Sequence, residues 1–199
     1  MKTILCLTVC GLFLAAATTF ATLDIVKSGA DWVVGDTSSG RVLGTFWNPD
    51  DSSSDFGYEG GSGKPEFFWS KERQYVAVNG GASRSRQVYL YQVVGKSLKP
   101  VEIPGLSDEQ AADINALKDV RADGADAVRW QGDDTLLVHF WAVDRVRGDE
   151  EEGKKADVWA DVEVNDGEAK IVGTSSEQPD APSSQSSFPN PAPPSGETL

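Results

Sequence analysis

Residues 74–79 read QYVAVN and residues 87–93 read QVYLYQV, and these two segments decide the fold. In the first, Tyr75 and Ala77 alternate with valines, and the second alternates aromatic and aliphatic side chains in the same way. A strand turns successive side chains to opposite faces, so a period of two in aromatic and β-branched residues indicates β-structure. The two segments are therefore predicted to be strands of a meander.

Further strand candidates lie on both sides of these segments. They are separated by polar or glycine-containing connections, and Asn165-Asp166-Gly167 is a strong signal for a tight hairpin turn. The further candidates are residues 31–34, 41–47, 66–70, 98–103, 127–131, 135–143, 156–164 and 168–174. The sequence therefore predicts a mainly β domain.

One helix is predicted between the strands, over residues 107–119. It begins with a capping-box sequence in which Ser107 is followed three residues later by Gln110. Behind this start, Ala111, Ile114 and Leu117 recur at helical spacing. The helix is expected to be short.

Residues 68–78 can be aligned with residues 128–138. In each segment a tryptophan closes a first strand, a polar turn follows, and an apolar second strand comes next. Two more strands follow in both cases, and residues 89–93 (YLYQV) match the third strand of a propeller blade. In these features the chain resembles β-propeller repeats, over about residues 66–104 and more weakly over residues 126–174.

This resemblance implies antiparallel four-stranded meanders in a small secreted bacterial protein. The expected layout is two blade-like sheets plus an N-terminal pair of strands, with the one short helix. A propeller usually needs four to eight blades to close, and this chain supplies two and a partial one. We therefore expect a single β-rich domain without a closed ring in the monomer, and self-association that completes a ring is the alternative.

The first 21 residues have the anatomy of a cleavable signal peptide. Lys2 provides a basic start, an apolar run extends from Ile4 to Ala17, and Thr19-Phe20-Ala21 gives a small-x-small cleavage site. A retained membrane anchor needs a longer apolar run, of about 18 residues or more. A lipoprotein reading of Cys10 is opposed by the valine before it. We expect a secreted or periplasmic protein without a membrane span, whose mature chain has no cysteine.

The rest of the chain is predicted to consist of one domain, residues 22–174, and a disordered tail, residues 175–199. The tail is rich in proline and serine and has almost no aliphatic residue. The whole chain has a net charge of −13, which becomes −14 when Lys2 leaves with the signal peptide. Phosphate binding requires a basic surface, so no nucleic-acid partner is expected. The negative charge of the chain would instead attract a cationic partner.

The residues that could carry catalysis or bind a metal do not have the required spacing. His139 is the only histidine and stands among apolar residues, and the chain has no G-x-S-x-G elbow and no cysteine outside the signal peptide. Residues 57–64 are glycine-rich but lack the hydroxyl residue and the helix that follow the lysine of a phosphate-binding loop. Asp119–Asp126 misses the EF-hand pattern, since Arg121 and Trp130 occupy ligand positions, and an ordinary turn is favoured. We predict no catalytic residue, no cofactor and no metal site.

The remaining functional candidates are aromatic residues around the polar loop Asn48–Lys64. Trp47, Phe56 and Tyr58 flank or lie in this loop, where exposed aromatic side chains would contact an unknown protein or carbohydrate partner. The alternative is that they pack locally within the loop. The predicted function is a non-catalytic binding module. The alternatives are a proteinaceous inhibitor of a cationic secreted enzyme such as a lysozyme, a carboxylate-dependent hydrolase, and a degenerate propeller fragment with a structural role.

Overall fold

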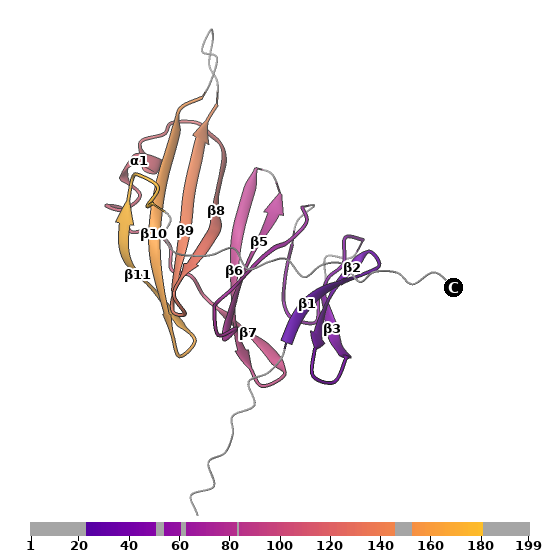
Figure 1. Cartoon of the computed structure of the whole chain (residues 1–199). Helices are drawn as coiled ribbons and strands as arrows, with labels where there is room; N and C mark the ends of the chain where they lie inside the picture. Colours follow the sequence, from indigo (N-terminus) through magenta and orange to yellow (C-terminus); the bar gives the residue numbers. More distant parts are fainter. Residues whose placement is uncertain (1–22, 51–53, 61–62, 83, 146–152, 181–199) are drawn as a thin grey trace, which may run out of the picture.

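The protein is mainly β with one short helix, as the sequence predicted (Figure 1). The computed structural model describes residues 23–50, 54–60, 63–82, 84–145 and 153–180, so the predicted signal peptide lies outside it. An antiparallel three-stranded sheet, here the N-terminal sheet, contains β1 (Leu23–Ser28), β2 (Asp31–Asp36) and β3 (Arg41–Trp47). A second sheet contains β4 (Glu66–Trp69), β5 (Tyr75–Ala82), β6 (Ser85–Val94), β7 (Ser97–Val101), β8 (Val120–Gln131), β9 (Thr135–Asp144), β10 (Lys155–Asn165) and β11 (Glu168–Ser175).

The second sheet combines two antiparallel runs of consecutive strands, β4 to β7 and β8 to β11. A short parallel pairing of β6 with β8 joins the runs, with Ser85 opposite Asp123 and Arg86 opposite Gly124. The expected layout of two separate blade-like sheets is not confirmed, because this pairing makes one sheet of eight strands.

The N-terminal sheet has three strands, where the sequence predicted a pair. β1 pairs with β2 along its whole length, from Leu23 opposite Asp36 to Ser28 opposite Asp31. The segment LDIVKS is too short and too polar for its alternation to stand out in the sequence. It forms a strand because Leu23 and Ile25 are buried in a core that distant segments complete.

Two hydrophobic cores lie on opposite sides of the β4–β7 run. The first core contains Tyr75 and Ala77 and lies between this run and the β8–β11 run. The second core contains Val76 and Val78 and lies between the β4–β7 run and the N-terminal sheet. The predicted alternation is thus confirmed, and it is apolar in both phases because these strands are buried on both faces. The β4–β7 run is the middle of three layers, as Figure 1 shows.

The helix α1 (Ala112–Asn115) is shorter than the predicted one. The capping box itself forms: the Ser107 N–H donates to Gln110 Oε1 at 2.9 Å, and the Gln110 N–H donates to Ser107 Oγ at 3.3 Å. The helix ends early because β8 begins at Val120 and the chain must extend before it.

The turn expected at Asp119–Asp126 is wrong. From Val120 onward these residues form the first half of β8, which pairs with β9. A long partner strand outweighs the local turn preference of aspartate and glycine. Asp123 and Asp126 are an odd number of positions apart on this strand and therefore lie on opposite faces.

The last strand extends one residue beyond the predicted end of the domain at residue 174. Ser175 is the last residue of β11, and residues 176–180 are described as well. Residues 181–199 of the predicted tail lie outside the described part of the chain.

Asp36, at the end of β2, attaches the N-terminal sheet to the middle layer. Its buried carboxylate accepts hydrogen bonds from the Ser38 N–H (3.0 Å), Ser38 Oγ (2.5 Å) and Ser39 Oγ (2.8 Å). It also pairs with Lys96 Nζ, at 2.9 Å, in the connection between β6 and β7. The Ser38 hydroxyl first, and then Lys96, hold the pKa of Asp36 well below its ordinary value of 3.8.

Replacement of Asp36 by Asn should lower the free energy of unfolding at about pH 7. A depressed pKa in the folded state stabilises the protein above the ordinary pKa, and this contribution declines as the pH falls below 3.8. Urea unfolding of wild type and Asp36→Asn should therefore differ most at about pH 7, and the difference should begin to decrease at about pH 3, between the ordinary pKa and the lower pKa of the folded state. Asp31→Asn, at the start of the same strand, is the control, and an equal loss of stability for Asp36→Asn at both pH values would contradict this assignment.

Candidate functional site

Two of the three predicted partner-binding aromatic residues are buried. Trp47 is 6% exposed and Tyr58 is 0% exposed, and both belong to the second core. Tyr58 stacks on Phe46 with ring centroids 4.6 Å apart and meets Tyr89 edge-on. Burial raises the pKa of Tyr58 above its ordinary range. The expectation that Trp47 and Tyr58 are exposed contacts is wrong, and the alternative, local packing of the loop, describes them.

Phe56 is half-buried and packs against the second core. Its ring lies so close to Gly44 in β3 that a Cβ there would come within 2.8 Å of it. The preceding Asp55 fixes this position, because its carboxylate accepts a hydrogen bond from the Thr45 N–H at 2.8 Å. The described part of the loop is therefore attached to β3, and residues 51–53 and 61–62 lie outside the description.

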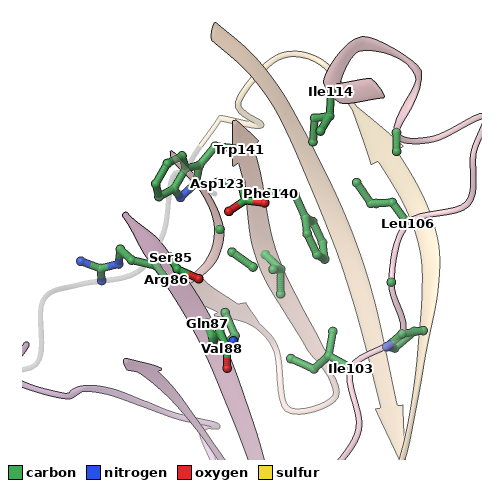
Figure 2. A pocket seen from close by; sticks show the side chains of 16 residues that line it. Ser85, Arg86, Gln87, Val88, Ile103, Leu106, Ile114, Asp123, Phe140 and Trp141 are labelled. Atoms are coloured by element: carbon green, nitrogen blue, oxygen red, sulfur yellow. The ribbon is translucent and has the colours of Figure 1, made fainter. Parts of the chain in front are cut away.

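A pocket of about 490 Å³ opens where the two runs of the second sheet meet, and we call it the junction pocket (Figure 2). In Figure 2, Phe140 from β9 points into it, and Ile103, Leu106 and Ile114 face it from the chain between β7 and β8. Its lining consists of Ser85, Arg86, Gln87, Val88, Ile103, Pro104, Gly105, Leu106, Ala111, Ile114, Asp123, Gly124, Ala125, Val138, Phe140 and Trp141. The interior of the pocket is thus mostly aliphatic and aromatic, and four polar side chains come from β6 and β8.

The pocket exists because β6 and β8 pair over only two positions. Beyond Arg86 and Gly124 the backbones separate, and the connection that includes α1 covers the gap between them. The pairing itself requires glycine, since a Cβ at Gly124 would lie 2.7 Å from the Arg86 carbonyl oxygen and 2.9 Å from its nitrogen. Close approach at one glycine therefore sets the distance between the two runs.

Side-chain to backbone hydrogen bonds hold the runs together beside this glycine. Asn79 in β5 is 3% exposed; its Nδ2 donates to the Ala127 carbonyl at 2.9 Å, and its Oδ1 accepts from the Ala127 N–H at 2.6 Å. The Trp130 Nε1–H donates to the Phe68 carbonyl at 2.8 Å. The Asn79 amide thus replaces a strand partner for β8 in the region where β5 and β8 are not paired.

The charged groups at the pocket leave an excess of negative charge. Arg86 pairs with Glu66 at 2.9 Å and with Asp126 at 2.5 Å, so its guanidinium is compensated. Asp126 also accepts a hydrogen bond from the Trp141 Nε1–H at 2.8 Å. Asp123 is exposed at the pocket and forms no salt bridge within the described residues. A positively charged group is therefore the favoured neighbour of this carboxylate.

His139 does not line the pocket. It contacts Asp157 (Nε2 to Oδ1, 2.7 Å) and stacks on Trp159, with ring centroids 4.0 Å apart and an interplanar angle of 7°. His139 is thus packed against neighbouring side chains at a partly exposed position. Within the described residues no group of three or more His, Cys, Asp or Glu side chains is arranged to hold a metal ion.

Comparisons with protein-family models, with curated proteins and with solved structures found no significant match. In the described residues, no helix has the length and apolar character needed to cross a membrane.

Sequence reasoning did not find the junction pocket, because its lining comes from segments far apart in the chain. One signal was Leu106, which stands in the connection after the predicted strand 98–103; Ile103 lies in the same connection because β7 ends at Val101. Aliphatic side chains in a connection indicate that it covers an apolar surface.

Replacement of Gly124 by Ala should destabilise the protein by about 1–3 kcal/mol, because the added Cβ meets backbone atoms of Arg86 that cannot easily move. Gly105→Ala is the matched control: it also lines the pocket, but nothing lies within 4 Å of an added Cβ. Urea unfolding of the two variants measures the difference. Equal stability of both variants would show that the close approach at Gly124 does not constrain the sheet.

Proposed function

We propose that this protein is an exported, non-catalytic binding module and that the junction pocket is its ligand site. The observation that carries the proposal is a pocket of about 490 Å³ with a mostly apolar lining, located where the two runs of the sheet meet. Ligand sites commonly have this size, this lining and this kind of position between structural units. A small number of polar groups at the pocket, from β6 and β8, would orient a ligand.

The chemistry of the lining favours a ligand with an apolar body and a positively charged end. Phe140, Ile114 and Leu106 would contact the apolar part, and the Asp123 carboxylate would face the charge. The acidic chain would also attract such a ligand over a longer distance, since its net charge is −13. The ligand could be a small molecule or an apolar side chain next to a basic residue on a protein.

The lining supports binding rather than catalysis. Among its residues, Asp123 is the one carboxylate, Ser85 the one hydroxyl, and Arg86 a guanidinium already paired with two carboxylates. Nucleophilic catalysis requires a base within hydrogen-bonding distance of the nucleophile, and among the described contacts no hydrogen bond joins the Ser85 hydroxyl to the Asp123 carboxylate.

A second candidate function is inhibition of a cationic secreted enzyme such as a lysozyme. The same negative excess at the pocket favours it, because a basic protein surface could place an apolar side chain in the pocket beside Asp123. Electrostatic complementarity of this kind raises association rates and contributes to specificity.

The relation of the two runs to propeller blades is also a proposal. β4 to β7 and β8 to β11 are each four consecutive antiparallel strands, and each includes the tryptophan, turn and apolar strand of the aligned segments. These features support an origin from a blade-like unit.

Binding of octyltrimethylammonium to the whole chain tests the proposed function. Burial of part of the octyl chain should give a dissociation constant on the order of 0.1–1 mM, because each buried methylene contributes about 0.8 kcal/mol before the cost of association. Octanoate, with a carboxylate on the same kind of chain, should bind about tenfold more weakly. Isothermal titration calorimetry measures both.

Two variants locate the site. Ala111→Trp fills the pocket and should abolish binding, and Asp123→Asn should reduce the preference for the cationic probe. Val172→Trp, on an exposed position of β11 outside the pocket lining, is the control. Unchanged binding by Ala111→Trp, or equal affinity for the two probes, would contradict the assignment.

A further inference from the structure

Leu137 lies on the face of the β8–β11 run that is turned away from the first core, where a side chain is expected to contact solvent. Its side chain is nevertheless fully buried. Its neighbours Leu136 and Val138 belong to the first core, so alternation directs Leu137 to the opposite face, here called the outer face. Leu137 is nevertheless 0% exposed and belongs to neither core. On this face its partner across β8 is Arg129. Across β10 its partner is Asp161, which accepts a hydrogen bond from Gln131 at 2.9 Å, and a further segment bound to Arg129 lies on the same face.

That segment is the chain directly after β11. One Nη2 atom of Arg129 donates hydrogen bonds to two consecutive carbonyl oxygens, those of Pro179 and Asp180, each at 3.0 Å. Ser175 lies opposite Trp159 in β10, whereas Arg129 is in β8. Residues 176–180 therefore pass across β10 and β9 to reach β8, and Figure 1 shows the chain turning back from β11 over its neighbours.

The groups near this segment suit a peptide that contains proline. Pro179 is half-buried and has no N–H, so its carbonyl is the only backbone group that it offers. The stacked rings of His139 and Trp159 lie on the same outer face, and aromatic surfaces are common partners of proline-rich segments. The Nε of Arg129 is buried and has no hydrogen-bond partner among the described residues, so it is a donor available to a further carbonyl.

We infer that the outer face of β8–β10 is a binding surface for a proline-containing peptide, and that residues 176–180 occupy it as a tethered ligand. Arg129 contacts backbone carbonyls, so recognition depends on the peptide backbone more than on particular side chains. Among the hydrogen bonds of the described residues, the side chain that binds this segment to the outer face is that of Arg129. Residues 176–178 are exposed. The segment is therefore displaceable, and a peptide of the same chemistry added in solution competes with it.

Backbone 15N relaxation of the full chain tests the attachment. In wild type, the amides of Gln178 and Asp180 should have heteronuclear NOE values similar to those of β11. Arg129→Ala should lower them to the values of an unattached segment, while Arg121→Ala, an exposed arginine of the same strand, should leave them unchanged. Low values in wild type, or values unchanged in Arg129→Ala, would overturn the inference.

A synthetic peptide of residues 175–182 tests the binding surface without removing Arg129. The peptide should shift the Leu137 methyl and Arg129 Nε–H signals of the full chain. Pro179→Gly weakens the tethered segment, so the same peptide should bind this variant about tenfold more tightly than wild type, since a tethered competitor acts at a high effective concentration. Absence of these shifts in both proteins would overturn the inference, whatever the relaxation data show for the attached segment.

Discussion

The structure depends on the pair of hydrogen bonds between the buried Asn79 amide and the backbone of Ala127. Leaving a buried polar side chain without a hydrogen-bond partner costs about 1–3 kcal/mol of stability. Burial of Asn79 therefore favours the arrangement in which β5 and β8 lie close enough for these two bonds to form. This attachment brings β8 to the edge of β6, and the small size of Gly124 lets the two backbones pair there. The first core lies between the two runs that this contact joins, and the sheet of eight strands includes both runs.

The same contact also produces the junction pocket. Pairing of β6 and β8 is limited to two positions, so the edges separate immediately afterwards and the apolar surface between them needs a cover. Ile103, Leu106 and Ile114 provide that cover from a connection, which leaves a space rather than a packed interior. In the proposed function, this site would bind a ligand through shape and apolar contact, and Asp123 would add a preference for positive charge.

Sequence reasoning succeeded where local pattern alone determines structure. The alternation around Tyr75 and Val76 predicted a strand, and the hydrogen bonds of the predicted capping box at Ser107 form, although α1 begins only at Ala112. It failed where contacts between segments distant in the chain determine the structure. The glycine and aspartates after Val120 suggested a turn, but pairing with β9 makes them a strand. Tyr58 was expected at the surface because its loop is polar, but Phe46 and Tyr89 enclose it. The pocket could not be predicted, since no segment contains more than a few of its residues.

The central claim is that the junction pocket, and not the polar loop beside β3, is the binding site. Methyl-resolved NMR of the whole chain during titration with octyltrimethylammonium tests it most directly. The account predicts shifts at Ile103, Leu106 and Ile114, which line the pocket, while Ile25 and Val34 in the second core remain unchanged. Shifts at Ile25 and Val34, or no shift at the pocket, would contradict it.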